Sequence, residues 1–228
     1  ADALRICHDH FPSGPESLAA HLGIEVVRAS MSGCDGWCLR RGSVAKVRLN
    51  QDAPRPRQRF TLAHELAHLI QGTEPDLQLH LDSMLASDEK EERAANQLAA
   101  EMLLPRPKVE EAVNLLPVDA ATLKRLARQA RVSEIMAACR IASLATDLKL
   151  VNAAVLGFVG DQHRWTWSKT PRLKMEDASA LLAETRKVRP KLARFEQSNG
   201  MVATAFCLGS EEHPAVFIQF LPPEVGRQ

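Results

Sequence analysis

The sequence predicts an α+β fold, and three patterns support this class. Short stretches in which apolar and polar residues alternate within the first fifty residues indicate β-strands. Apolar residues recur at helical spacing over residues 60–70 and again over residues 87–104, which indicates two helices. The last third of the chain alternates strand-like runs with one helix. We therefore expect three parts, which cover residues 1–110, 111–148 and 149–228.

The first fifty residues predict two helices followed by an antiparallel sheet. The second helix opens at Ser13, which has capping-box spacing to Glu16, and it ends at Gly23. Alternating residues then indicate three strands, at residues 24–27, 37–39 and 44–49. Because the last two strands flank an Arg41-Gly42 turn, we expect an antiparallel sheet ahead of the next helix.

Two strong helices follow these strands. The first covers residues 60–70, and Gly72 is its expected C-cap. Residues 73–88 are acidic and weakly periodic, which predicts a loop with a short helix. The second strong helix covers residues 87–104 and ends before Pro105, because proline disrupts a helix interior.

The first of these helices carries an H-E-x-x-H motif, formed by His64, Glu65 and His68. Residues four apart lie on one face of a helix, so both imidazoles can bind one tetrahedral zinc ion. Glu65 lies beside that face, where its carboxylate can accept a proton from an attacking water and pass it to a leaving amine. The motif therefore predicts a zinc-dependent endopeptidase with Glu65 as its catalytic base.

A catalytic zinc site needs a third protein ligand, and the second helix offers candidates. Glu92, Ala95 and Ala99 share one face of it, where the small alanines allow another helix to approach closely. We expect Glu92 to be the third ligand, and Glu89 and Glu91 are the alternatives. Zinc is the expected ion, although manganese or another divalent ion also fits two imidazoles and a carboxylate.

Two further roles around the metal can be assigned from the sequence. Asn96, one turn beyond the proposed carboxylate ligand, could accept the second ring N–H of His64 or His68 and fix its tautomer. Stabilising a tetrahedral oxyanion requires a donor besides the metal, and the chain contains no tyrosine. A histidine, an arginine or a backbone N–H must serve instead, and His80 is one candidate.

Two segments resemble the ImmA/IrrE family of metallopeptidases: RFTLAHELAHLI at residues 59–70 and ERAANQLAAEMLLP at residues 92–105. The resemblance implies a zincin domain of the thermolysin-like class, in which Glu92 matches the third ligand. The sequence departs from the family pattern at Leu98, where an aromatic residue is common, and in the order of residues 102–105. Members characteristically cut a helix-turn-helix repressor at one site, which relieves repression of stress, mobile-element or defence genes. We expect the signal to be stress, DNA damage or phage invasion.

Cys34 and Cys38 flank Gly36-Trp37 just before the expected edge strand, which in zincins runs along the cleft. A thiolate at this place could occupy the open zinc position and inhibit the enzyme. The alternative is that both cysteines are small buried packing residues. Activity measurements on Cys34→Ala and Cys38→Ala would distinguish these hypotheses.

Residues 111–148 resemble a helix-turn-helix, with helices at residues 121–127 and 133–144. Its first half is basic, since it contains Lys124, Arg125 and Arg128. The second helix opens with residues that are poorly suited to base or phosphate contacts. A scaffold or substrate-docking role is therefore favoured over DNA reading.

Residues 149–228 predict a small α+β sensor similar to the GAF-like domain of some family members. Between Arg164 and Arg194 there are nine basic residues and three acidic ones, beside two tryptophans. This composition is typical of a groove that binds single-stranded nucleic acid, which would activate the protease. The alternative is a solvated basic face with tryptophans in the core. The candidate contact residues are Trp165, Trp167, Arg172, Lys174, Lys187 and Arg189.

Composition excludes several other classes. The 29 lysines and arginines nearly balance the 28 aspartates and glutamates, so bulk charge predicts neither a nucleic-acid protein nor an acidic substrate. The five cysteines form no C-x-x-C pair, which argues against a disulfide framework and a structural zinc finger. The sequence does not open with a charged segment followed by an apolar one, and no apolar run approaches the roughly 20 residues that span a bilayer. We therefore expect a cytoplasmic protein without a membrane partner.

Two alternative functions remain beside the repressor-cleaving endopeptidase. One is a general cytosolic metallopeptidase without repressor specificity. The other is a non-catalytic regulator that binds DNA and uses the metal only to brace its fold. An intact Glu65 favours an enzyme, because a purely structural site needs no base beside an open metal position.

Overall fold

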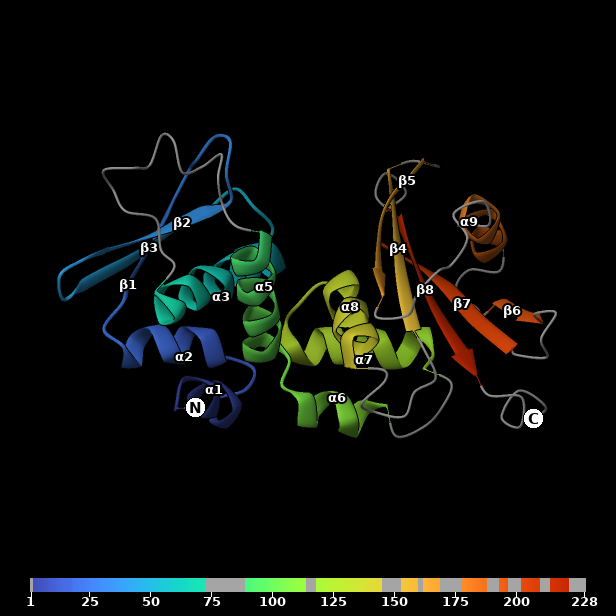
Figure 1. The fold of residues 1–228 in the computed structure, drawn as a ribbon, viewed down its shortest axis with the longest axis horizontal. Coiled ribbons are helices and arrows are strands. Elements are labelled where there is room, and N and C mark those ends of the chain that lie inside the picture. Colours follow the sequence, from blue (N-terminus) through green and yellow to red (C-terminus); the bar gives the residue numbers. More distant parts are fainter. Residues whose placement is uncertain are drawn as a thin grey trace. The chain divides into compact units, whose positions relative to one another are not determined.

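The computed structural model divides the chain into two compact units (Figure 1). Unit 1 comprises Ala1–Pro105 and Ala130–Val132, and unit 2 comprises Arg106–Gln129 and Ser133–Gln228. Each unit contains helices and a β-sheet, so the predicted α+β class is confirmed. The structure describes residues 2–72, 89–113, 118–144, 153–159, 162–168, 178–187, 193–196, 202–209 and 214–221.

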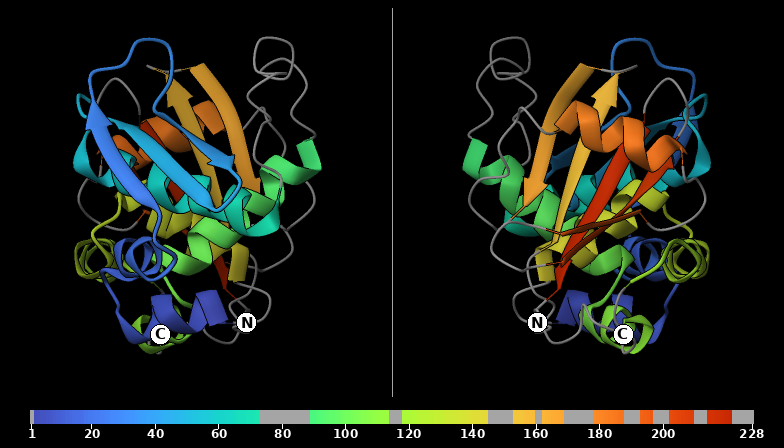
Figure 2. Two further views of the ribbon diagram at one scale, coloured as in Figure 1. Left: turned by 90° about the vertical axis from the view of Figure 1, so that its left-hand side faces the viewer. Right: turned by 90° about the vertical axis from the view of Figure 1, so that its right-hand side faces the viewer.

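Unit 1 packs helices against one three-stranded sheet. Its elements in chain order are α1 (Asp2–Asp9), α2 (Gly14–His21), β1 (Glu25–Ala29), β2 (Gly36–Arg41), β3 (Val44–Asn50), α3 (Arg55–Gln71) and α5 (Glu89–Leu103). Helix α3 contacts β2 and β3 on one side and α2 and α5 on the other (Figures 1 and 2). Buried leucines and alanines of α3 fill the space between these layers. Helix α3 is therefore the central element of unit 1.

The sheet of unit 1 has the order β1-β3-β2 and is mixed. Strands β2 and β3 form the expected antiparallel hairpin, and Gly42 in its turn has a φ of +60°. Strand β1 pairs with β3 in parallel, with Val26 opposite Val47, so the expectation of an antiparallel sheet was wrong for this strand. Alternation along a strand shows which face is buried, but the direction of its partner depends on how the chain returns to the sheet.

Helix α2 begins without the expected capping box. Ser13 is its N-cap residue but makes no side-chain capping bond, so that expectation was wrong. The Glu16 carboxylate instead binds the Arg59 guanidinium, at 2.8 and 3.3 Å. Arg59 also donates to the carbonyl oxygens of Ala130, at 2.7 Å, and Arg131, at 3.1 Å. This partly buried charge network joins the first half of α3 to α2 and to the 130–132 turn.

Helix α3 ends as expected at Gly72. This residue has a φ of +67°, in the left-handed region that glycine adopts without steric cost, and its amide donates to the carbonyl of His68. Helix α5 begins at Glu89 and ends at Leu103, close to the expected bounds and before Pro105.

Unit 2 contains a five-stranded antiparallel sheet with the order β5-β4-β8-β7-β6. Helix α9 (Ala178–Lys187) covers one face of it and α8 (Glu134–Leu144) the other (Figure 1). Phe217, at the centre of the sheet, is fully buried. The remaining elements are α6 (Arg106–Ala112), α7 (Ala120–Ala130), β4 (Ala153–Val159), β5 (Gln162–Ser168), β6 (Ala193–Glu196), β7 (Val202–Gly209) and β8 (Pro214–Leu221).

Two elements of unit 2 were not expected from the sequence. Helix α6 follows Pro105 directly and carries Pro107 in its first turn, where a missing backbone N–H costs nothing. Strand β6 has only four residues, too few for alternation to indicate a strand. Helix α6 and strand β6 were missed because sequence patterns for helices and strands are least reliable in short elements.

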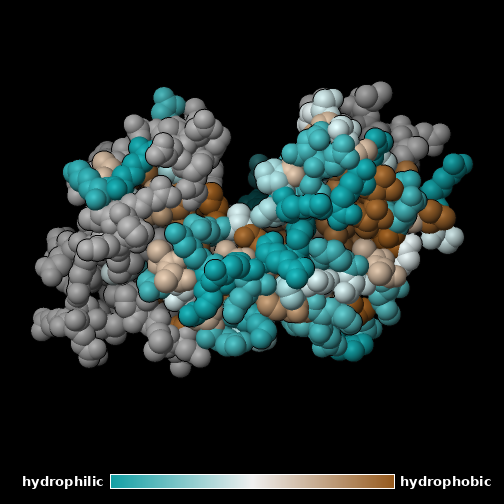
Figure 3. All heavy atoms as spheres, turned by 180° about the vertical axis from the view of Figure 1, so that it is seen from behind, coloured by the Kyte–Doolittle hydropathy of each residue, from teal (hydrophilic) through white to brown (hydrophobic). Residues whose placement is uncertain are grey.

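Apolar side chains are gathered inside the two units. Among the described residues, the large apolar side chains that are exposed are Leu22, Val44 and Ile70. The face in Figure 3 is correspondingly mostly hydrophilic, apart from grey regions and smaller apolar areas. Within the described ranges, no helix combines the length and apolar character needed to cross a membrane.

Candidate metal centre

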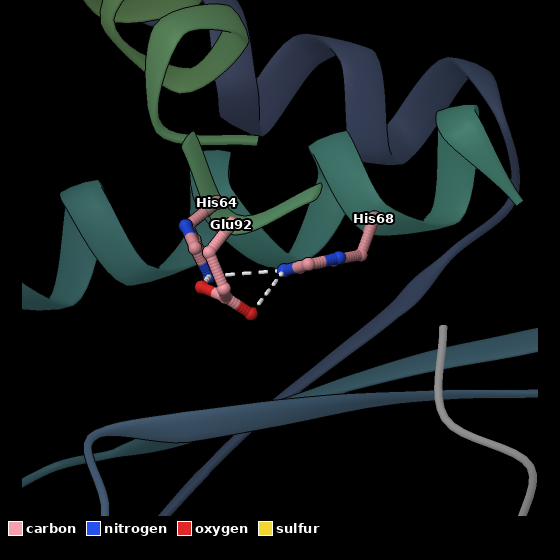
Figure 4. A group of neighbouring side chains, drawn as sticks. All are labelled: His64, His68 and Glu92. Carbon is pink, nitrogen blue, oxygen red and sulfur yellow. Dashed lines mark hydrogen bonds and ion pairs between the residues drawn. The ribbon is translucent and has the colours of Figure 1, made fainter. Parts of the chain in front are cut away.

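The two histidines of the H-E-x-x-H motif point from α3 toward a carboxylate on α5 (Figure 4). Helices α3 and α5 pack closely because alanines line their seam: Ala63, Ala67, Ala95 and Ala99 are all fully buried. This close packing brings Glu92 to both imidazoles. The side chains of two residues on α3 and one residue on α5 therefore meet at one point.

The donor atoms have a spacing close to that of a tetrahedral zinc site. The Nε2 atoms of His64 and His68 lie 3.1 Å apart, and Glu92 places Oε2 3.4 Å from the first and Oε1 3.4 Å from the second. Donors around one tetrahedral zinc ion are separated by about 3.3–3.6 Å, given metal–ligand distances near 2.0–2.2 Å. The His64, His68 and Glu92 donors thus fit a divalent ion, and among the described residues they form the one such cluster.

Asn96 fixes the orientation of the His64 ring. The Nδ1 atom of His64 lies 3.1 Å from Oδ1 of Asn96. Because Oδ1 can only accept, Nδ1 carries the proton and Nε2 keeps a lone pair for a metal. Burial, with the neighbouring His68, lowers the pKa of His64, which favours the neutral form that binds metals. Phe60, whose ring stacks on His64 with centroids 6.2 Å apart, was not singled out from the sequence.

Glu65 is held against strand β2 by Cys38. The Cys38 thiol and backbone N–H both donate to the Glu65 carboxylate. Burial, with a smaller effect of the nearby Glu92 charge, raises the pKa of Glu65 to about 7, although the two Cys38 hydrogen bonds act to lower it. A carboxyl group with a pKa near 7 can accept and return a proton at neutral pH.

The two cysteines that were considered as blocking ligands lie at different places. Cys38 is 1% exposed and is hydrogen-bonded to Glu65. It does not belong to the cluster of His64, His68 and Glu92. Cys34 is half-buried, and its carbonyl oxygen accepts a hydrogen bond from Asn50, at 3.5 Å. The Cys38–Glu65 pairing could not be found from sequence, because no spacing rule relates a strand residue to a helix residue 27 positions later.

The alternative ligands lie away from the cluster. Glu89 is exposed and pairs with Arg93 on its own helix, at 3.2 Å. Glu91 is also exposed. Of the three candidate carboxylates, Glu92 alone belongs to the donor cluster found in the described part of the chain.

The other predicted site residues lie in unit 2 or outside the described residues. Trp165 and Trp167 belong to strand β5, and Lys187 is an exposed residue at the end of α9. The basic residues of α7 are exposed, and its apolar face is buried through Leu123 and Leu126. The candidates that fall outside the described residues are His80, Arg172, Lys174 and Arg189.

Comparison with known proteins places this site within a recognised domain. A family model described as the IrrE N-terminal-like domain of the M78 peptidases matches residues 19–142, which include all the donors above. A solved structure of a Mycobacterium tuberculosis transcriptional regulator is similar, with a TM-score of 0.64, 15% identity, and coverage of 96% of this chain and 86% of that one. None of the curated proteins matches this chain.

Proposed function

Because this chain belongs to the IrrE N-terminal-like family of M78 metallopeptidases, we propose that it is a zinc-dependent endopeptidase that cleaves a helix-turn-helix transcriptional repressor. The main support is the cluster of His64, His68 and Glu92 donors, with Glu65 beside it. An arrangement of two imidazoles, one carboxylate and a separate half-buried carboxyl group is typical of hydrolytic rather than structural zinc sites.

The residues that hold the ion are His64, His68 and Glu92. Two imidazoles and one carboxylate favour zinc over the oxygen-preferring ions, and manganese is the next candidate. A divalent ion at this place supplies Lewis acidity, which polarises the scissile carbonyl and makes water a better nucleophile. Asn96 keeps the His64 ring in the tautomer and orientation that binding requires.

Glu65 carries the proton during hydrolysis. Its carboxylate takes a proton from the attacking water and gives it to the amine that leaves, so the residue returns to its initial state. The half-buried position of Glu65 and the Cys38 bonds limit how far this carboxylate can move. Glu65→Gln should therefore keep the metal ligands intact while removing the base.

The substrate and the signal are proposed from the family and from one similar structure. Repressor cleavage comes from the family resemblance, and the similar solved structure is described as a transcriptional regulator. We assign a thermolysin-like zincin domain to residues 1–110, a helix-turn-helix-like docking segment to residues 111–148 and a GAF-like sensor to residues 149–228. Stress, DNA damage or phage invasion is the expected signal, and single-stranded DNA is the proposed activator.

A cleavage assay tests this function. Purified wild-type protein and Glu65→Gln would each be loaded with zinc and incubated with helix-turn-helix repressors encoded near its gene. Each reaction would be run with and without a short single-stranded oligonucleotide, and mass spectrometry would identify the products. We expect one cut by the wild type and none by Glu65→Gln. Absence of cutting under every condition, with zinc bound, would contradict the proposal and favour a DNA-binding regulator.

A further inference from the structure

Strand β2 runs beside helix α3, and the two elements contact each other at regular intervals. Gly36 lies against Thr61, since a Cβ atom at residue 36 would come within 2.5 Å of the Thr61 methyl carbon. Four residues further along the strand and eight further along the helix, the Arg40 guanidinium donates to the carbonyl oxygen of Leu69, at 2.6 Å. Four strand residues span about 13 Å and eight helical residues about 12 Å, so the two contacts hold the elements in register.

An ion pair just before the contact of Gly36 with Thr61 supports the same register. The Asp35 carboxylate, directly before β2, binds the Arg57 guanidinium in the first turn of α3, at 2.6 and 2.7 Å. Arg57 is one helical turn before Thr61, so this ion pair lies on the same side of α3 as the contact of Gly36. The strand is therefore held at both of its ends along one side of the helix.

Cys38 and Glu65 are the pair at the middle of this register. Cys38 is two residues after Gly36, and Glu65 is one helical turn after Thr61. Cys38 points to the inner face of the sheet, because its cross-strand partner Val47 is fully buried there. Its thiol and amide consequently meet the Glu65 carboxylate, and both donate to it.

We propose that Cys38 is a positioning residue for the catalytic base: its thiol and amide donate to the Glu65 carboxylate and orient the free lone pairs of that carboxylate for proton transfer. This inference rests on the proposed peptidase function. The thiol acts here as a hydrogen-bond donor and not as a metal ligand. The contacts of Asp35, Gly36 and Arg40 with α3 keep the donor at the required place.

Kinetics of Cys38 variants test the proposal. Cys38→Ala removes the thiol donor, and we expect kcat to fall roughly five- to tenfold, as for the loss of one modest hydrogen bond to a charged group, with KM within about twofold. Cys38→Ser restores a donor and should recover most of this loss. Cys7→Ala, which also removes a fully buried thiol of unit 1, is the matched control and should keep the wild-type kcat.

The assay would use the repressor cut by the wild-type protein, with zinc content and melting temperature measured for each variant. A wild-type kcat in Cys38→Ala would overturn the proposal. Equal losses in Cys38→Ala and Cys38→Ser would also overturn it, because they would show that the size of the thiol matters rather than its proton.

A spectroscopic experiment is independent of catalysis. The S–H stretching band of Cys38 can be identified by infrared spectroscopy from the difference between the wild type and Cys38→Ala, without any substrate. In Glu65→Leu the thiol loses its acceptor, so this band should move to higher frequency. An unchanged frequency would exclude the hydrogen bond. If the band moves but no repressor is cut, the hydrogen bond between Cys38 and Glu65 is supported and the proposed peptidase function is contradicted.

Discussion

The Nδ1 atom of His64 donates to the Oδ1 atom of Asn96 across the seam between α3 and α5, at 3.1 Å. The bond joins a proposed ligand on one helix to the helix that carries the third ligand. It therefore favours one tautomer of the imidazole and links the two helices beside the candidate metal centre.

Asn96→Ala should weaken metal binding. Without the acceptor, the His64 ring can rotate and can change its tautomer, so we expect zinc affinity to fall roughly 10- to 100-fold. Competition with a chromophoric chelator would measure this affinity. Gln97→Ala, at the next and exposed position of α5, is the control and should bind zinc like the wild type. Equal affinities for both variants would show that Asn96 does not orient the ligand.

Zinc should stabilise the folded protein through Glu92. Binding to the folded state alone adds about 4 kcal/mol to the free energy of unfolding when zinc is at a thousand times its dissociation constant. Glu92→Gln replaces one donor with a poorer ligand and should remove most of this gain. Urea unfolding with and without zinc would measure it, and Glu89→Gln, on an exposed side chain of the same helix, should keep the full gain. A zinc-dependent gain that survives in Glu92→Gln would mean that another residue completes the site.

Glu65 should make the stability of the metal-free protein depend on pH. Its pKa is raised from 4.5 to about 7, mainly by burial, so the folded protein binds this proton more tightly than the unfolded chain does. The contribution of Glu65 to the free energy of unfolding therefore falls as pH rises from about 4.5 to about 7. Glu65→Gln lacks this titration and should gain stability relative to the wild type at pH 8.

Urea unfolding of both proteins with a chelator at pH 5 and pH 8 would measure this effect. At pH 5 the wild-type carboxyl is mostly protonated, so the two proteins should differ little. At pH 8 Glu65→Gln should be the more stable. A difference that is the same at both pH values would show that the buried carboxyl titrates normally.

The clustering of His64, His68 and Glu92 was predictable from the sequence because these residues follow local spacing. His64 and His68 are four residues apart on one helix, and Glu92 shares a face with alanines that can only serve close helix packing. In a regular α-helix, residues three or four positions apart have side chains on the same face. Asn96, one turn from Glu92, follows the same rule.

Features that depend on contacts between distant elements were not predictable. The parallel pairing of β1 with β3 depends on the path of the chain between them. Glu16 binds Arg59, which is 43 residues later, instead of capping its own helix. The bonds of Cys38 to Glu65 depend on the register of a strand against a helix. Residue patterns describe one element at a time, so such relationships need the assembled fold.

Thr204 and Gln219 in unit 2 provide a last test, because they face each other across β7 and β8 and are both buried. The Oε1 atom of Gln219 accepts from the Val118 amide, at 2.8 Å, whereas Nε2 of Gln219 and the Thr204 hydroxyl have no hydrogen-bond partner in the described structure. Gln219→Leu leaves a buried amide unpaired and should lower the free energy of unfolding by about 1–3 kcal/mol. Thr204→Val keeps the shape and removes an unpaired hydroxyl, so stability should stay the same or rise. Urea unfolding midpoints would compare them, and an equal loss in both variants would mean that the Thr204 hydroxyl is paired in solution.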